Sequence, residues 1–201
     1  MTDIVLAAGK ASRLGGSCKA LIEVAGRRAI DRQAELLSDP LVVVRSKHAQ
    51  AVVDAGYRPV VCDTLGGPIR ALRTALEEVD DRDTVRVVFA DTMLRTIPEP
   101  GNWVLYDYAY GGREWDTVHL YTTGVFSARS WFPASDYRAV AVGAYSFTDV
   151  PTLRATIRRV PDDGPFAWLL NAYPHLLSGI RAHGWQDVGT PESLAKYEVD
   201  K

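Results

Sequence analysis

Residues 4–24, IVLAAGKASRLGGSCKALIEV, decide the fold of this chain. The apolar run 4–8 is bounded by glycine, which predicts a short buried strand. Glycines, hydroxyls and cations then follow as far as Lys19, and a second apolar run begins at Ala20. Glycine lets backbone N–H groups approach phosphate oxygens, while Arg13 offers a planar fork of donors and Lys19 a compact charge. The stretch therefore predicts a strand that opens into a loop for an anionic ligand.

Two common phosphate-binding patterns are absent from this stretch. A P-loop would need Lys-Ser or Lys-Thr directly after its last glycine, but Gly16 is followed by Ser17 and Cys18. A dinucleotide-binding G-x-G-x-x-G pattern would need glycine where Ala11 and Leu14 stand. The alternative to a phosphate loop is a mobile connection between two core strands, since glycine-rich loops are common.

Composition indicates a single globular domain over residues 1–201. Hydrophobic residues make up 47% of the chain and the net charge is −2, so a broad nucleic-acid-binding face is not expected. No apolar run reaches membrane-spanning length, and two cysteines form no disulfide framework. We therefore expect a cytoplasmic protein that binds neither membrane nor nucleic acid.

Apolar runs alternate with helical spacing through the first half of the chain. We expect strands at 4–8, 41–44, 59–62 and 84–90, and helices at 29–38, 48–55 and 69–79. This alternation predicts an α/β fold with a mixed, mostly parallel sheet and helices on both faces. Ligands bind beyond the carboxyl ends of such strands, so the loop 9–19, the pair Gly66-Gly67 and Asp91 should share one rim.

The second half has an antiparallel pattern that should extend the sheet. Segments 103–106 and 117–121 flank two glycines and predict a hairpin. Further strands are expected at 123–126 and 139–147, and helices at 152–159, 166–177 and 191–197. Thr190 precedes the last helix and suits its N-cap.

Asp91 directly follows the predicted strand 84–90. A carboxylate at this position is a candidate Mg²⁺ ligand, because Mg²⁺ takes one or two carboxylates together with substrate phosphates. The alternative is an aspartate that caps the next segment.

Residues 6–30, LAAGKASRLGGSCKALIEVAGRRAI, resemble the signature of the sugar nucleotidyltransferases, L-A-A-G-x-G-[ST]-R-L followed by P-K-x-L and G-[KR]-P-[LI]. Ala11 replaces the second glycine and Cys18 replaces the proline. FADTM (89–93) resembles the family's acidic strand end, and GWQDVGTPESLAKYE (184–198) its W-x-D-x-G-T-P-E segment. Weaker resemblances cover 66–76, 122–126 and 136–147. The family's Glu-Lys-Pro sugar-contacting segment is missing.

The resemblance implies a Rossmann-like, GT-A-like fold and transfer of a nucleotidyl group from an NTP to a sugar 1-phosphate or similar acceptor. It implies that Arg13 binds the β- and γ-phosphates, that Lys19 bridges the α-phosphate and the acceptor, and that Asp91 and Asp187 hold Mg²⁺. The implied nucleotide-binding residues are Leu6, Ala7, Ala8, Gly9, Lys10, Ser12, Gly66 and Gly67. The implied acceptor-binding residues are Gly124, Gly143, Tyr145 and Thr190.

Residues 1–100 would then form the nucleotide-binding half and residues 101–201 the acceptor half of a monomer or homodimer. Two alternatives stay open. The first is a cytidylyl- or guanylyltransferase that resembles the phosphocholine, methylerythritol phosphate or molybdopterin enzymes. The second is a nucleotide-sugar-binding module without catalysis, although Lys19, Asp91 and Asp187 favour an enzyme.

Overall fold

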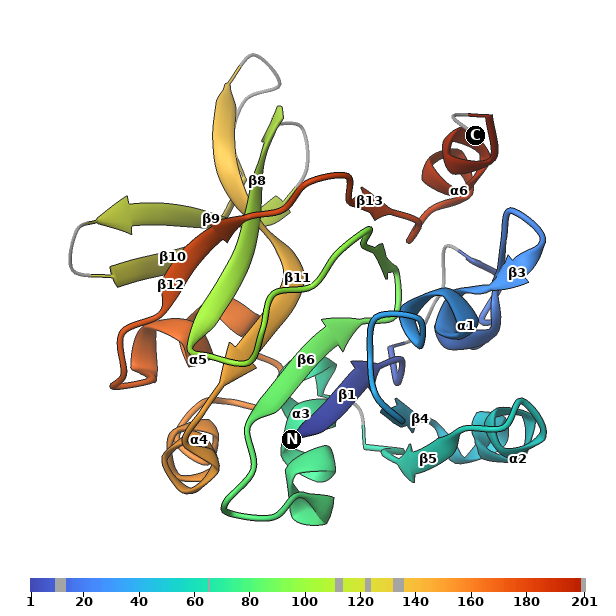
Figure 1. The fold of residues 1–201 in the computed structure, drawn as a ribbon, viewed down its shortest axis with the longest axis horizontal. Coiled ribbons are helices and arrows are strands. Elements are labelled where there is room, and N and C mark those ends of the chain that lie inside the picture. The colour runs from blue at the N-terminus through green and yellow to red at the C-terminus, as the bar shows by residue number, and fades with distance from the viewer. Residues whose placement is uncertain (10–13, 65, 111–113, 122–123, 132–135, 200–201) are drawn as a thin grey trace.

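The computed structural model describes residues 1–9, 14–64, 66–110, 114–121, 124–131 and 136–199, and a single large sheet forms its centre (Figure 1). Four strands of this sheet run parallel, in the spatial order β6 (Val85–Phe89), β1 (Thr2–Leu6), β4 (Leu41–Val44) and β5 (Arg58–Val61). The apolar runs of β1, β4 and β6 are buried on both faces, as parallel strands covered by helices require, whereas Val61 of the edge strand β5 is exposed.

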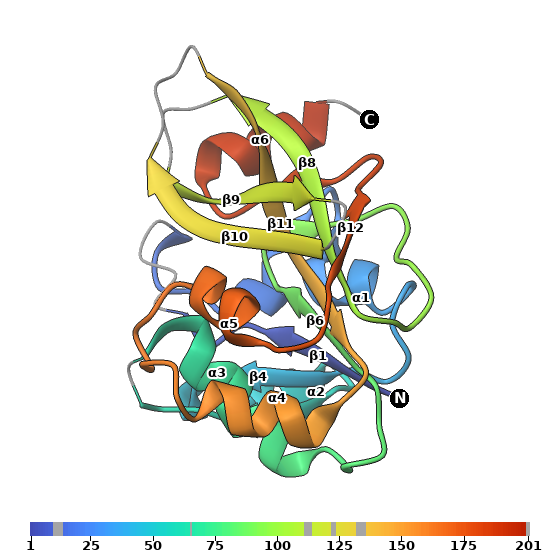
Figure 2. The same ribbon diagram turned by 90° about the vertical axis from the view of Figure 1, so that its left-hand side faces the viewer.

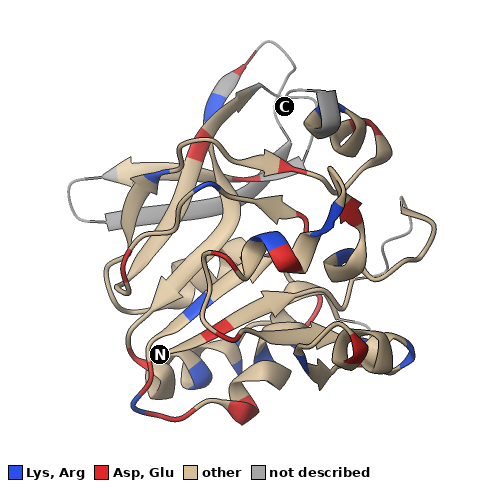
Figure 3. Ribbon diagram, turned by 45° about the vertical axis from the view of Figure 1, so that its right-hand side comes forward, with Lys and Arg blue, Asp and Glu red and all other residues tan. Residues whose placement is uncertain are grey.

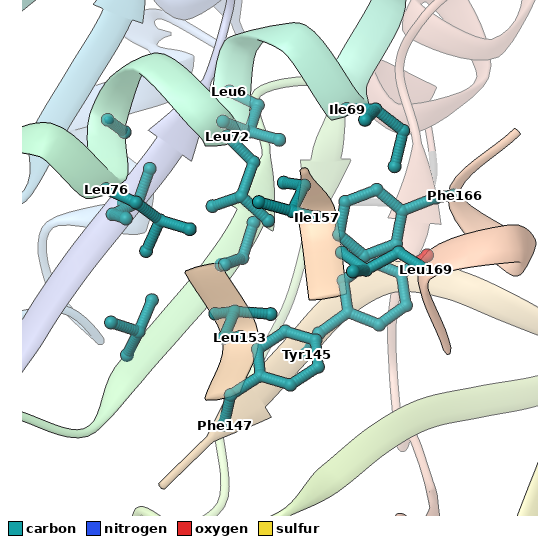
Figure 4. Close-up of a cluster of buried hydrophobic side chains, with 14 of the residues drawn as sticks. Leu6, Ile69, Leu72, Leu76, Tyr145, Phe147, Leu153, Ile157, Phe166 and Leu169 are labelled. Atoms are coloured by element: carbon teal, nitrogen blue, oxygen red, sulfur yellow. The ribbon is translucent and has the colours of Figure 1, made fainter. Parts of the chain in front are cut away.

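Successive side chains of these strands enter two different core clusters. Ile4 and Leu6 of β1 join the cluster under α3 (Gly67–Ala75), α4 (Val150–Ile157) and α5 (Phe166–Ala172), part of which Figure 4 shows. Val5 joins the cluster on the other face, under α1 (Ala29–Gln33) and α2 (Ser46–Asp54). This period of two, with helices on both faces, confirms the predicted α/β architecture.

The second half continues the sheet with antiparallel strands (Figure 2). The long strand β11 (Tyr137–Phe147) pairs with β6, and the hairpin of β9 (Glu114–Tyr121) and β10 (Gly124–Trp131) joins it further along. On the opposite edge β11 pairs with β8 (Trp103–Tyr110), which in turn pairs in parallel with β12 (Ser178–Arg181). The division into a nucleotide half and an acceptor half stays a prediction.

Two small sheets and short helices complete the fold. They are β2 (Glu23–Val24) with β3 (Arg27–Arg28), β7 (Thr92–Met93) with β13 (Gln186–Asp187), the 3-10 helices η2 (Lys19–Leu21) and η3 (Leu76–Glu78), and α6 (Pro191–Val199). The amide of Ser193 donates to Oγ1 of Thr190, so Thr190 caps α6 as predicted.

The predicted hairpin of segments 103–106 and 117–121 is wrong. In the described residues β8 pairs with β11 and β12, whereas β9 pairs with β10 and β11. The reason is that β11 lies between β8 and β9: it pairs with β8 along much of its length and meets β9 at Val140 and Thr117, while β9 pairs mainly with β10. The helix expected at 166–177 is shorter and ends at Ala172, two residues before Pro174, which cannot continue a helical hydrogen-bond ladder.

Acidic and basic positions are interspersed along the ribbon, and Figure 3 shows no single sign gathering on the face in view. This agrees with the small net charge of −2. Among the described residues, none of the helices has the length and apolar character needed to cross a lipid bilayer.

Candidate active site

A cavity of about 470 Å³ opens beyond the carboxyl ends of β1 and β6. Leu6 and Phe89, the last residues of these two neighbouring strands, both line it. Gly9 of the predicted phosphate loop and Gly67, at the start of α3, line it as well. The parallel strands thus bring Gly9 of the predicted loop and Gly67 to one rim, as the sequence predicts for these two residues.

Lys19 and Asp91 form an ion pair within this cavity. Buried Cys18 and Ala20 flank Lys19 and anchor η2 to the core, while the side chain of Lys19 stays partly exposed. Its Nζ lies 2.5 Å from Oδ2 of Asp91, which follows β6. The strand end therefore presents a carboxylate to the cation that follows the phosphate loop.

Asp187 comes from the far end of the chain to the same place. The short strand β13 pairs Asp187 with Thr92, and the amide of Val188 donates to the backbone oxygen of Asp91 at 2.9 Å. Gly189 then lies against both carboxylates: a Cβ atom there would be 2.8 Å from Oδ1 of Asp187 and 2.8 Å from Oδ2 of Asp91. The two oxygens are thus separated by no more than twice that distance.

This pair of carboxylates fits a divalent cation. Carboxylate oxygens are the hard ligands that Mg²⁺ prefers, and the space beside Gly189 is one that a methyl group would fill. Within the described part of the chain, no group of three or more His, Cys, Asp or Glu side chains is arranged as a metal site. Two carboxylates are nevertheless the usual protein share of a Mg²⁺ site whose other ligands are phosphates and water.

A bulge in β11 forms a part of the cavity wall that contacts the residues on either side of Asp91. The register of β11 against β8 shifts between Ala141 and Tyr145, and Gly143 within this bulge has φ +81°. A Cβ at Gly143 would lie 2.7 Å from Oγ1 of Thr92, so only glycine permits this close approach. The hydroxyl of Thr92 donates to the carbonyl of Val142 at 2.9 Å, which ties the bulge to the strand that follows Asp91.

Another part of the cavity wall combines aromatic rings with a carboxylate. The ring of Tyr145 packs 4.4 Å from that of Phe166 and 5.8 Å from that of Phe89, measured between centroids. Burial raises the pKa of Tyr145 well above its usual range, and the nearby carboxylate of Asp116 raises this pKa further. Oδ2 of Asp116 accepts a 3.1 Å hydrogen bond from the amide of Ala167 at the start of α5. This part of the cavity can hold an apolar or cationic group between rings and carboxylate.

Most of the predicted site residues in the described part of the chain meet at this cavity. Those that line it are Leu6, Ala8, Gly9, Lys19, Gly67, Asp91, Gly143, Tyr145 and Asp187. Lys10, Ser12 and Arg13 lie outside the described residues.

Three predicted site residues do not line this cavity. Ala7 belongs to the buried core on the α1 side of the sheet, and Thr190 caps α6. Gly66 lies against Arg70 and Asp162: a Cβ atom added at this glycine would be 2.8 Å from Cβ of Arg70. Gly124 begins β10, and its contact with an acceptor stays a prediction.

Sequence reasoning missed several lining residues that the fold brings in from separate segments. They are Phe89, Thr92, Asp116, Asp163 and Phe166. Thr92 directly follows Asp91, the predicted metal ligand, and this adjacency in the sequence is the signal that could have identified it. No comparable signal marks Asp116. Its place at the cavity depends on how the strand that carries it pairs, and the local sequence does not show this pairing.

Comparison with known proteins gives the class. Residues 4–98 match the MobA-like NTP transferase domain family. Residues 4–98 are therefore similar to an NTP transferase domain, in agreement with the predicted nucleotidyltransferase class. No curated protein matches the sequence significantly.

Solved structures extend the likeness to the whole chain. A candidate glucose-1-phosphate thymidylyltransferase from Bacillus anthracis has a TM-score of 0.81 at 20% identity, covering 99% of this chain and 94% of that one. The CTP:phosphocholine cytidylyltransferase of Streptococcus pneumoniae gives 0.72 at 19% identity, covering 99% and 98%. The inositol-1-phosphate CTP transferase of T. maritima gives 0.73 at 13% identity, covering 98% and 94%.

At these identities the solved structures show the fold. It is the GT-A-like fold of the nucleotidyltransferases, with the mixed sheet and the antiparallel second half that the sequence resemblance implied. The likeness of fold extends over nearly the whole chain and does not identify its substrates.

Proposed function

We propose that this protein transfers a nucleotidyl group from an NTP to the phosphate of a small phosphorylated acceptor, most simply a sugar 1-phosphate, and releases pyrophosphate. The observation that carries the proposal is the convergence of Lys19, Asp91 and Asp187 at the rim of one cavity. These three groups come from three distant parts of the sequence, and the NTP transferase domain supplies two of them.

The reaction needs positioning and charge neutralisation more than it needs a covalent nucleophile. An oxygen of the acceptor phosphate forms a bond to the α-phosphorus, and the bond from that phosphorus to the bridging oxygen of the β-phosphate breaks. Phosphate is nucleophilic at neutral pH, so no side chain has to remove a proton. Pyrophosphate leaves with the electron pair of the broken bond.

Lys19 is positioned to neutralise phosphate oxygens at the α-phosphate. Asp91 and Asp187 would hold Mg²⁺, which when bound neutralises phosphate charge and fixes the geometry of the triphosphate. Backbone groups of Ala8, Gly9 and Gly67 would contact the nucleotide. Arg13 is proposed to bind the β- and γ-phosphates, and Gly143 and Tyr145 to contact the acceptor.

A substrate screen tests this function. Each of the four common NTPs is combined with a panel of phosphorylated acceptors and Mg²⁺, and pyrophosphate release is measured. We expect release that requires one NTP, one acceptor and the metal together. The same pairs should give release about 10²- to 10³-fold slower with Lys19→Met, which removes the cation but keeps most of the length of the side chain. Tight nucleotide binding without release from any pair would favour a binding module instead.

A second acceptor class is favoured by one feature of the cavity. The aromatic ring of Tyr145 and the carboxylate of Asp116 lie near each other in the cavity wall, and the carboxylate of Asp163 also lines the cavity. Aromatic faces and carboxylates together suit a cationic head group such as that of phosphocholine. This makes a cytidylyltransferase with an amine-bearing phosphate ester the alternative. Including phosphocholine and amino-sugar phosphates beside neutral sugar phosphates in the screen separates the two.

A further inference from the structure

Gln33, at the end of α1, is a buried polar residue for which the proposed reaction has not yet given a role. Only 4% of its surface is exposed. Its amide Nε2 donates to the backbone oxygen of Phe89 and to that of Thr92, each at 2.9 Å. These two carbonyls stand on either side of Asp91 in the sequence. One side-chain amide thus closes the turn that presents the proposed metal ligand.

The chemistry of the contact fixes the orientation of this amide. Two carbonyl oxygens face the same group, so that group has to be the NH₂ end, and both of its hydrogens are used. The other end, Oε1, is buried without a hydrogen-bond partner in the described part of the chain. Within the described residues, both hydrogen bonds of this side chain therefore go to the turn around Asp91.

Besides the hydroxyl of Thr92, which donates to the carbonyl of Val142, the other contacts of the turn come from backbone groups on two sides. The amide of Ala90 donates to the carbonyl of Leu6, and the backbone oxygen of Asp91 accepts from the amide of Val188. Gln33 supplies a third side. It stands on the helix that follows η2, the segment carrying Lys19, and α1 contacts both η2 and β7. Gln33 consequently connects the segment of the cation to the segment of the carboxylate.

We infer that Gln33 is a positioning residue that holds Asp91 in place while Lys19 and the metal exchange at its carboxylate. Oδ2 of Asp91 is bonded to Nζ of Lys19. When Lys19 turns to a phosphate, that oxygen loses its partner and the carboxylate has to stay where a cation can reach both it and Asp187. The clamp on the carbonyls of Phe89 and Thr92 keeps the backbone of Asp91 fixed through this exchange. The inference rests on the proposed function for the identity of the ligands.

The test compares metal binding in three proteins. Gln33→Met keeps the volume of the side chain and removes both donors. Ile30→Val is the control, because Ile30 is buried on the same helix, belongs to the core cluster on the α1 face of the sheet, and has a side chain that cannot donate a hydrogen bond to the turn carbonyls. For each protein, the dissociation constant of Mn²⁺ in the complex with a non-hydrolysable NTP analogue is measured by electron paramagnetic resonance. The affinity for the same analogue without metal is measured by calorimetry.

We expect Gln33→Met to weaken Mn²⁺ binding about tenfold, since residues that orient metal ligands have effects of this size. Metal-free nucleotide affinity should change no more than about twofold, because the clamp acts on the carboxylate rather than on the phosphate loop. Ile30→Val should change neither. Should Gln33→Met fail to fold, Gln33→Asn carries the test, since its shorter amide cannot reach both carbonyls.

Two results would overturn the inference: Mn²⁺ affinity of the folded Gln33 variant equal to that of the wild type, or an equal loss of Mn²⁺ affinity in Ile30→Val. The second would mean that the effect is a general consequence of loosening α1. A wild-type protein that binds Mn²⁺ and the analogue but releases no pyrophosphate would contradict the proposed function and leave the test of Gln33 intact.

Discussion

Lys19 and Asp91 are 72 residues apart in the sequence, and in the fold Nζ of Lys19 lies 2.5 Å from Oδ2 of Asp91. The cation that follows the phosphate loop therefore occupies an oxygen that the proposed metal would use. Both side chains keep about a quarter of their surface exposed, at 24% and 21%. Ion pairs with this degree of exposure contribute at most about 1 kcal/mol to stability. The pair is better explained by a role in the candidate active site than by a contribution to the stability of the fold.

Lys19→Met should accordingly separate activity from stability. We expect kcat/KM for nucleotidyl transfer to fall by about 10²- to 10³-fold, as when one charge-stabilising donor is removed from an active site. The melting temperature measured by circular dichroism should change little. Lys196→Met, on the exposed side of α6, is the matched control and should keep full activity. A fall in activity that only accompanies loss of folded protein would show that Lys19 has a structural role.

Gly189→Ala should damage the site while leaving the core intact. A methyl group there would lie 2.8 Å from a carboxylate oxygen of Asp91 and 2.8 Å from one of Asp187, so at least one of them has to move. A displacement of about 1 Å in a catalytic arrangement can cost about 10²-fold in rate. Steady-state measurement of pyrophosphate release checks this. Gly101→Ala is the control, since its Cβ would meet its nearest atom at 3.4 Å, and its rate should equal that of the wild type.

Asp3→Asn should destabilise the fold without altering the chemistry. Asp3 is fully buried and Arg86 nearly so, and Nε and Nη2 of Arg86 donate to Oδ1 and Oδ2 of Asp3 at 2.7 and 2.9 Å. The amide of Ser38 donates to the same carboxylate at 2.6 Å. Removing the negative charge leaves a buried guanidinium uncompensated, a change that costs about 3–5 kcal/mol. Urea denaturation should show this loss, and the folded fraction should retain wild-type kcat. A loss below 1 kcal/mol would mean that water reaches Arg86.

The carboxylate of Asp149 should make the free energy of unfolding depend on pH in the acidic range. The amide and the hydroxyl of Thr152 and the ring of His175 bond to its carboxylate and lower its pKa below the usual 3.8. Because the pKa is lower in the folded state, this contribution is complete above the unfolded-state value and is lost as pH falls through the folded-state value. Urea denaturation between pH 6 and about pH 2.5 should therefore show a smaller acid-induced loss in Asp149→Asn than in the wild type. Identical pH profiles would contradict the assignment.

The sequence predicts the parallel half of this fold well because the signal there is local. The run LVVV, 41–44, forms β4 with the predicted bounds, since four consecutive apolar β-branched or leucine residues suit a strand buried on both faces. Asp91 and Asp187 could be paired in advance only through the family resemblance. Nothing local in the sequence brings residue 187 beside residue 91, and the pairing of β13 with β7 does so.

The antiparallel half shows where local reasoning fails. Two strands separated by glycines suggest a hairpin, but β8 and β9 lie on either side of β11, which follows both of them in the chain. Gln33 shows the same limit for the site. Its helical spacing indicates only a buried position, and its bonds to Phe89 and Thr92 depend on packing between segments more than fifty residues apart.

The most direct test of the central claim is a crystal structure of the protein with a non-hydrolysable NTP analogue and Mn²⁺, examined for anomalous scattering. We predict a Mn²⁺ peak between the carboxylates of Asp91 and Asp187, with the triphosphate within hydrogen-bond reach of Nζ of Lys19. A peak at another place, or a nucleotide bound with its phosphates outside this cavity, would contradict the account.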